Sequence, residues 1–157
     1  MRPHLHSESE LAAFESEWEI SLPKHYRNYL MTVGGGCFTS SKVDLLEDWS
    51  YHADTLPKDY LQRPFPHTEP WNDRTLLTDE GWNSPYFSDE WVAGSIRIRQ
   101  TGCEGRDILI VSGSLRGEVW HDDRACDGEG IFPLIDDDRR RLHFDDYIER
   151  SPQNQRS

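Results

Sequence analysis

The stretch from Gly102 to Trp120 limits the possible folds of this chain more than any other. At its centre, residues 108–111 (Ile-Leu-Ile-Val) form the only uninterrupted aliphatic run. A short β-branched run bounded by Gly and Ser is typical of a strand covered on both faces. Residues 112–117 (Ser-Gly-Ser-Leu-Arg-Gly) predict a turn, after which the extended pattern resumes at residues 118–121. The stretch therefore predicts a β-hairpin.

A third strand is expected just upstream of this hairpin. Residues 94–99 (Gly-Ser-Ile-Arg-Ile-Arg) alternate apolar and polar side chains, as a half-buried strand does. Residues 93–122 are therefore predicted to be a three-stranded antiparallel meander whose second strand lies inside a sheet. This meander is a scaffold and contains no evident reaction centre.

Two helices are predicted before the meander and one after it. Ser7 and Glu10 have the spacing of a capping box, and Leu11, Phe14 and Trp18 share one face, which predicts a helix over residues 7–18. A second helix should begin at residues 22–23 (Leu-Pro) and end at the glycine triplet 34–36. The last helix is expected at about residues 143–150, with its apolar residues on one face.

The remaining segments have weaker patterns. Residues 37–39 and 42–46 are interpreted as a short hairpin, and residues 47–73 as irregular, with room for a short helix within 48–61. Residues 75–77 could form a short strand or a turn. Residues 79–91 place four aromatic residues in a predicted loop, where they either cover the core or form an exposed patch for a partner.

Composition limits the class of protein. A chain of 157 residues suits one domain, here residues 1–150 followed by a polar tail at 151–157. The formal net charge of −12 disfavours nucleic acid and anionic membranes as partners and suits a basic protein, although acidity can also simply maintain solubility. The widely spaced cysteines Cys37, Cys103 and Cys126, with no apolar leader or spanning segment, predict a reduced, cytoplasmic protein.

Several motifs together resemble a known family. Gly102-Cys103, the aliphatic strand, Gly113 and residues 117–120 (Gly-Glu-Val-Trp) resemble the core of the Knr/Smi-like proteins of the SUKH superfamily. Four more blocks match: residues 22–36 (Leu-Pro to Gly-Gly-Gly), residues 65–71 (Phe-Pro to Trp), residues 127–134 and the final helix. The resemblance covers roughly residues 8–149. It assigns structural roles to Pro23, Tyr26, Gly35, Gly102, Gly113, Gly117, Trp120 and Pro133.

The resemblance implies both a fold and a function. The fold would be a single α+β domain with a mostly antiparallel sheet of about four to six strands. Two N-terminal helices and a C-terminal helix would pack on this sheet. Many bacterial members are immunity proteins encoded beside polymorphic toxins. The implied function is therefore non-catalytic binding of a cognate toxin by a monomer or weak dimer, without a cofactor.

No reaction motif supports an enzyme. Cys103, Cys126 and His121 lack the local pattern of a cysteine nucleophile or of a zinc site. Aligning Gly128 with the invariant glycine of an EF-hand puts Ala125 and Leu134 where oxygen ligands are needed, so the calcium match fails. Paired carboxylates occur in any acidic protein and are not specific. We therefore expect no catalytic, cofactor-binding or metal-ligating residues.

An acidic, aromatic surface is the expected binding site. The partner would be a basic toxin domain, such as a nuclease whose own site is lined with Lys and Arg. The predicted charged face is Asp122, Asp123, Asp127 and Glu129, with Asp136, Asp137 and Asp138 as its rim; the predicted aromatic anchors are Trp82, Tyr86, Phe87 and Trp91. Two alternatives stay open: a regulatory or scaffold protein without a toxin partner, and a hydrolase that uses carboxylates or Cys126.

Overall fold

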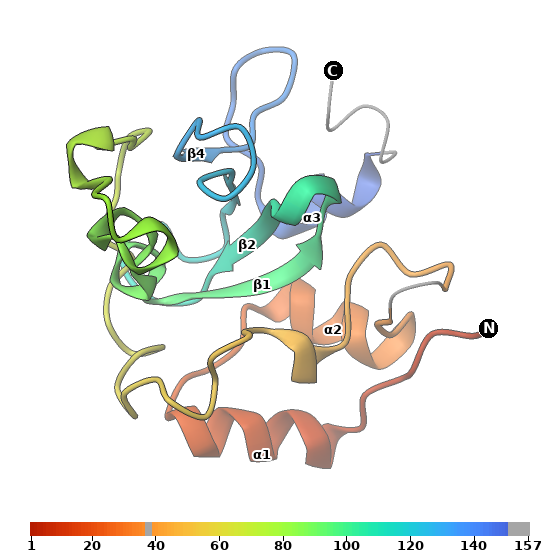
Figure 1. Ribbon diagram of the computed structural model, residues 1–157. Helices are drawn as coiled ribbons and strands as arrows, with labels where there is room; N and C mark the ends of the chain where they lie inside the picture. The colour runs from red at the N-terminus through yellow and green to blue at the C-terminus, as the bar shows by residue number, and fades with distance from the viewer. Residues whose placement is uncertain (37–38, 151–157) are drawn as a thin grey trace.

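The computed structural model describes residues 1–36 and 39–150 (Figure 1). Helices α1 (Glu8–Trp18) and α2 (Lys24–Thr32) come first, and a four-stranded sheet and helix α3 (Phe144–Glu149) follow. The strands are β1 (Ser95–Gln100), β2 (Arg106–Ile110), β3 (Val119–Asp122) and β4 (Ile131–Pro133). Short 3₁₀ helices occupy the chain between α2 and β2. The predicted α+β architecture, with two N-terminal helices and a C-terminal one, is confirmed.

The sheet is antiparallel throughout, in the order β1-β2-β3-β4. The predicted meander is confirmed as β1, β2 and β3, and β2 lies inside the sheet between the other two. The register pairs Arg106 with Asp122 and Ile108 with Trp120 across β2 and β3. Gly113 and Gly117 have φ of +102° and +99° in the connecting turn, which explains why glycine stands at both positions.

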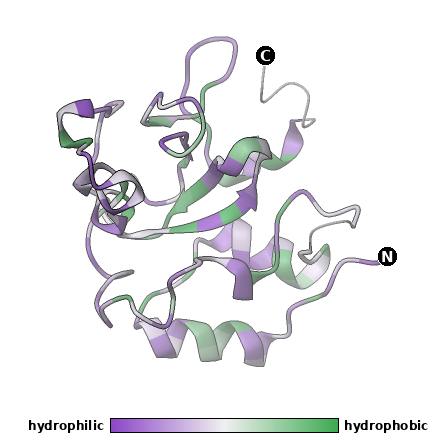
Figure 2. Ribbon diagram, viewed as in Figure 1, coloured by the Kyte–Doolittle hydropathy of each residue, from purple (hydrophilic) through white to green (hydrophobic). Residues whose placement is uncertain are grey.

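Both faces of β2 are covered, as the aliphatic run predicts. Leu109 and Val111 pack in one buried cluster with residues of α1, α2 and α3, including Leu11, Tyr26 and Phe144. Ile108 and Ile110 pack on the opposite face with Trp120 and Phe65. Hydrophobic residues accordingly lie along the strands, while the connecting loops are mainly hydrophilic (Figure 2). The helices thus cover one face of the sheet, and irregular aromatic segments cover the other.

The helix boundaries follow the expected signals. The Ser7 hydroxyl accepts a hydrogen bond from the Glu10 amide at 3.1 Å, and the Glu10 carboxylate accepts one from the Ser7 amide. This confirms the predicted capping box. Pro23 is the residue before the first turn of α2, and Tyr26 of α2 is fully buried. The final helix is slightly shorter than predicted.

The glycine triplet brings the N-terminal segment against the end of α2. Gly35 forms an antiparallel bridge with His4, with amide–carbonyl distances of 2.9 Å and 3.0 Å. A Cβ on Gly34 would lie 2.3 Å from the His4 carbonyl oxygen, and one on Gly35 would lie 2.4 Å from that of Asp44. These close backbone contacts require glycine at both positions.

The middle of the chain differs most from the predictions. Residues 39–46 contain no strand, so the hairpin predicted there is wrong over the described residues; residues 37–38 lie outside them. Within residues 48–61, Asp48 ends the 3₁₀ helix Leu46–Asp48, and residues 49–61 form turns and bends rather than an α-helix. The segment Arg74–Leu76 forms a 3₁₀ helix. Instead of pairing with each other, these segments run beside the sheet: the Asp44 amide bonds to the Ile98 carbonyl, and Trp71 bridges to Ile131.

The polar tail predicted at residues 151–157 lies outside the described residues. Within residues 1–36 and 39–150, none of the helices has the length and apolar character needed to cross a membrane.

We predict that Gly34→Ala destabilises the protein by at least about 2 kcal/mol, because an alanine at φ +90° is strained and its Cβ overlaps the His4 carbonyl. Urea unfolding measures the change. Gly102→Ala is the matched control, since a Cβ there meets no atom within 4 Å. Equal stability of the two variants would contradict the tight contact.

Candidate functional site

Two surface grooves lie beside the end of β3. Successive side chains of a strand point to opposite sides, so Asp122 lines one groove while His121 and Asp123 line the other. The aromatic groove, about 640 Å³, is lined chiefly by Tyr51, Trp82, Phe87, Arg106, Asp122 and Arg124. The acidic groove, about 590 Å³, is lined chiefly by Asp107, His121, Asp123, Asp127, Glu129 and the cysteines Cys103 and Cys126.

The floor of the aromatic groove is a buried ion cluster. Asp122 is 4% exposed and accepts hydrogen bonds from Arg106 Nε at 2.9 Å and from Arg124 Nε and Nη2 at 2.9 Å and 2.8 Å. Arg106 comes from β2, and the strand register brings it opposite Asp122. One carboxylate therefore binds two guanidinium groups in a site largely shielded from water.

These interactions keep Asp122 ionised. Burial acts to raise the pKa of this carboxyl group, but the hydrogen bonds and charges of Arg124 and Arg106 outweigh it and hold the pKa well below its usual range. A lowered pKa in the folded state contributes stability above the pKa of the unfolded chain, and this stability is lost as the pH falls through the folded-state value. The cluster is consequently intact at neutral pH.

Arg124 also fixes the segment that carries the aromatic rim. Its Nη1 donates to the carbonyl oxygens of Tyr86 and Ser88, both at 2.9 Å. Tyr86 belongs to the 3₁₀ helix Pro85–Phe87, and Ser88 links it to the next 3₁₀ helix, Asp89–Val92. Short 3₁₀ turns have few internal hydrogen bonds, so the buried guanidinium supplies an anchor that the segment itself lacks.

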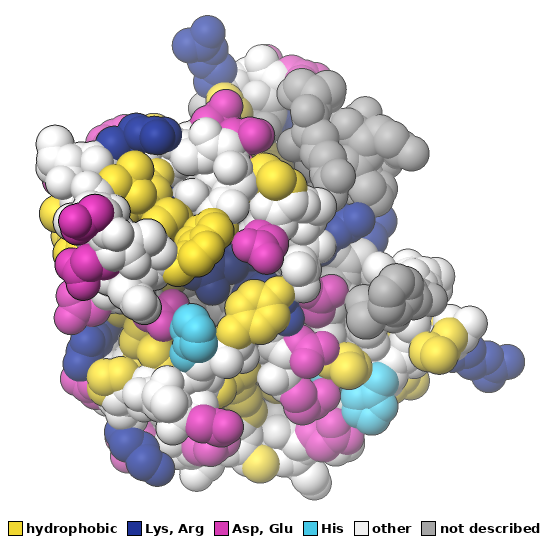
Figure 3. All heavy atoms as spheres, in the orientation of Figure 1, with side chains coloured by type: hydrophobic (Ala, Val, Ile, Leu, Met, Phe, Trp, Pro, Cys, Tyr) yellow, Lys and Arg dark blue, Asp and Glu magenta, His cyan; other side chains and the backbone are white. Residues whose placement is uncertain are grey.

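Exposed aromatic side chains form the rim of this groove. Trp82 is 66% exposed and Tyr51 is 63% exposed, which is unusual for rings of this size. The Trp82 ring lies 4.7 Å from the half-buried Phe87 ring, and the Arg97 guanidinium lies 4.4 Å from the centre of the Tyr51 ring. Hydrophobic side chains gather around a recess that shows Lys or Arg atoms at its bottom, with acidic side chains scattered over the same face (Figure 3).

The acidic groove contains a second charged network. His121 Nδ1 lies 2.8 Å from Asp107 Oδ1, and Asp107 Oδ2 accepts a hydrogen bond from the Tyr147 hydroxyl at 2.7 Å. His121 Nε2 lies 3.7 Å from Asp123 Oδ1. Burial alone would lower the pKa of His121, but the hydrogen bond to Asp107 and the charges of Asp107 and Asp123 raise it above its ordinary value. The two carboxylates thus favour the protonated form of the imidazole.

Cys103 and Cys126 are joined by a disulfide, with their Cα atoms 5.3 Å apart. The prediction of reduced thiols is wrong for this pair, and Cys126 has no free thiol for the nucleophilic role considered above. The cytoplasmic location loses the support drawn from free thiols, because disulfides persist mainly in oxidising compartments. The two loops joined by this bond separate the grooves: Glu104 and Ala125 line one, and the two cysteines line the other.

The predicted acidic face is only partly on the surface. Asp122 and Asp123 are buried at 4% and 7% exposure, so the prediction that they meet a partner directly is corrected: Asp122 binds arginines, and Asp123 accepts from the Glu129 amide. Asp136 is half-buried and accepts from the amides of its own turn. The predicted carboxylates that the structure leaves exposed are Asp127, Glu129, Asp137 and Asp138.

The predicted aromatic anchors also divide into two groups. Trp82 and Phe87 line the aromatic groove. Tyr86 is 1% exposed and its hydroxyl bonds to Asn72, so its prediction as an anchor is corrected. Trp91 is half-buried and stacks on Trp71 at 4.7 Å. The sequence reasoning missed Tyr51, Arg106 and Arg124; an aromatic residue in a segment rich in turn-forming residues was the only signal for Tyr51.

We predict that Asp122→Asn lowers the free energy of unfolding by about 3 kcal/mol, because it leaves two buried or half-buried guanidinium groups without their carboxylate. Chemical denaturation at pH 7 measures the loss. Asp127→Asn, at an exposed position, should change stability by less than about 0.5 kcal/mol. Similar small effects for both variants would show that the cluster does not hold the fold together.

Comparison with known proteins identifies the family. The model of the SMI1 / KNR4 family (SUKH-1) matches residues 6–150, which include all the helices and strands described above. No curated protein and no solved structure matches the chain. The match agrees with the motifs of the β2–β3 hairpin, the glycine triplet and the last helix. This chain therefore belongs to the SMI1/KNR4 family (SUKH-1).

Proposed function

We propose that this protein is an immunity protein that neutralises a cognate bacterial toxin by binding it through the aromatic groove. Membership of the SMI1/KNR4 family supports this function, because the family includes immunity proteins of polymorphic toxin systems. The observation that carries the proposal is the pair of widely exposed rings, Trp82 and Tyr51, on the rim of a groove with a rigid floor.

Exposed apolar surface and a segment that is already ordered both favour binding at this groove. Exposed aromatic rings gain free energy when a partner removes them from water, and Trp and Tyr are enriched among the residues that dominate binding energy. Because the Asp122–Arg124 pair holds the segment behind Trp82 and Phe87, little additional ordering is required on binding. The groove thus offers a preformed apolar contact.

Charge would guide the partner to this surface. The net charge is −12, and the exposed carboxylates Asp127 and Glu129 line the groove next to the aromatic one. A basic toxin domain, such as a nuclease that binds phosphate with Lys and Arg, complements this charge. The binder would occlude the toxin and carry out no reaction itself, as a monomer or weak dimer.

We predict that Trp82→Ala weakens binding to the toxin encoded beside this gene by about 30-fold, corresponding to roughly 2 kcal/mol. Calorimetric titration measures the affinity. Ile135→Ala is the matched control, since Ile135 is also an exposed hydrophobic residue (48%) but lies outside both grooves. Unchanged affinity for Trp82→Ala, with a loss for Ile135→Ala, would place the interface elsewhere.

We also predict that the association rate falls markedly between 0.01 M and 0.1 M salt, because the Debye length shrinks from about 30 Å to about 10 Å. The double substitution Asp127→Asn with Glu129→Gln should lower the rate at low salt and leave dissociation almost unchanged. Glu17→Gln on α1, exposed and outside both grooves, is the control. An association rate that does not depend on salt would show that charge does not accelerate the encounter. The aromatic contact would then be the remaining basis for binding.

A further inference from the structure

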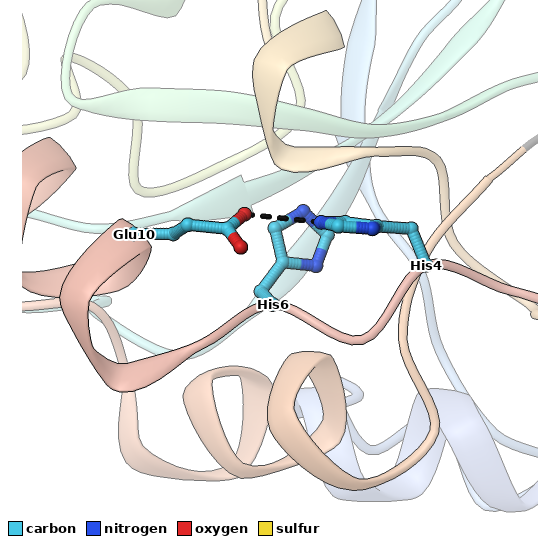
Figure 4. A group of neighbouring side chains, drawn as sticks. All are labelled: His4, His6 and Glu10. Atoms are coloured by element: carbon cyan, nitrogen blue, oxygen red, sulfur yellow. Dashed lines mark hydrogen bonds and ion pairs between the residues drawn. The ribbon is translucent and has the colours of Figure 1, made fainter.

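Three potential metal ligands meet near the N-terminus, on the opposite side of the sheet from Trp120. His4 and His6 are two residues apart in an extended segment, which places their side chains on the same side. Glu10 in the first turn of α1 faces them. Figure 4 shows the His4 ring and the Glu10 carboxylate pointing at each other beside the His6 ring. The zinc candidates in the sequence were His121 and the cysteines, so this group was not predicted.

The geometry suits a small transition-metal ion. His4 Nε2 lies 3.0 Å from Glu10 Oε2, and one potential ligand atom from each residue lies within 4.8 Å of the others. Zinc bonds of about 2.0–2.1 Å in tetrahedral geometry place ligand atoms about 3.3 Å apart. Small side-chain rotations would therefore bring the three atoms to coordinating distances. Two imidazoles and one carboxylate form a ligand set that zinc uses with a fourth position open.

The backbone already holds the ligands in place. His4 is paired with Gly35 through two hydrogen bonds, and the His6 amide donates to the Leu30 carbonyl at 2.9 Å. The His6 side chain is fully buried, so its ring cannot turn away into solvent. Glu10 uses Oε1 in the capping box and directs Oε2 at His4. Ordering of long side chains, a common cost of ion binding, is thus small here.

The His6 ring is incompletely satisfied by the protein. Its Nε2 accepts only a long hydrogen bond of 3.3 Å from the Leu46 amide and lies 3.4 Å from Glu47 Oε1, while the buried Nδ1 has no hydrogen-bond partner among the described residues. Figure 4 shows Nε2 as the ring nitrogen beside the His4–Glu10 pair, so the nitrogen that would bind the ion is the one with this single long hydrogen bond. Glu47 brings a second carboxylate to the same place, and the added negative charge favours a cation.

We propose that His4, His6 and Glu10 form a binding site for a divalent transition-metal ion of the zinc class, with Glu47 close enough to contribute to its charge balance. Imidazole ligands select such ions over Mg²⁺ and Ca²⁺, which prefer oxygen ligands. The other group of potential ligands, Asp123, Cys126 and Asp127, cannot use a thiolate because Cys126 is in the disulfide. The site lies at the junction of the N-terminal segment and α1, away from both grooves.

The test is calorimetric titration of the full, metal-stripped, oxidised protein with ZnCl₂ at pH 7.5, and with MgCl₂ for comparison. We expect one zinc ion per chain with a dissociation constant below about 10 μM, and no saturable magnesium binding. His4→Ala and Glu10→Gln should each weaken zinc binding more than about tenfold. Glutamine preserves the capping box, so Glu10→Gln remains informative if His4→Ala impairs folding.

Two variants serve as controls. His25→Ala removes an exposed histidine of α2, and Asp127→Asn alters the second group; both should bind zinc as the natural chain does. A melting temperature that rises with zinc in the natural chain and the controls, but not in His4→Ala or Glu10→Gln, gives an independent readout. Absence of saturable zinc binding, or unchanged affinity in either ligand variant, would overturn the proposal.

Discussion

The interaction between Asp122 and Arg124 connects the regular and irregular halves of this protein. Asp122 ends β3, and Arg124 follows it by two residues and reaches the carbonyls of Tyr86 and Ser88. The sheet thereby fixes a distant segment that has little regular structure of its own. A buried ion pair gives little net stability relative to an apolar pair because its groups must leave water. We interpret its role here as positional, because it holds the segment that carries Trp82 and Phe87.

The two faces of the sheet pack against different parts of the chain. One face packs on α1, α2 and α3 and supplies most of the buried aliphatic surface. The other packs on the aromatic rings of residues 65–92, with Phe65, His67 and Trp71 around Trp120. Few residues are needed for this second layer, because each ring removes a large area from water. A chain that is only 35% hydrophobic can in this way cover both faces of its sheet.

Local sequence patterns correctly predicted the strands and helices whose formation depends on neighbouring residues. The aliphatic run and the turn glycines identified β2 and the hairpin, and Ser7 with Glu10 identified the start of α1. Contacts between distant residues were not accessible in the same way. The Arg106–Asp122 pair depends on strand register, and the Cys103–Cys126 bond joins residues 23 positions apart. Asp122 was therefore predicted to be exposed, although it is buried and bound by two arginines.

The dependence on contacts between distant residues also explains why only some of the predicted aromatic anchors are exposed. Trp82 and Tyr86 occur four residues apart in one segment, yet one is 66% exposed and the other 1%. The difference arises from tertiary contacts, since Tyr86 packs beside Trp71 and bonds to Asn72. Pattern alone could not separate the ring that covers the core from the ring available to a partner.

The central claim is that the aromatic groove binds another protein. Hydrogen–deuterium exchange of the chain, free and in complex with its cognate toxin, tests it most directly, because it locates the interface without any substitution. The account predicts slower amide exchange at residues 81–91 and 100–106 on binding, with α1 unchanged. Protection confined to α1 and α2, with the groove segments exchanging as in the free protein, would contradict it.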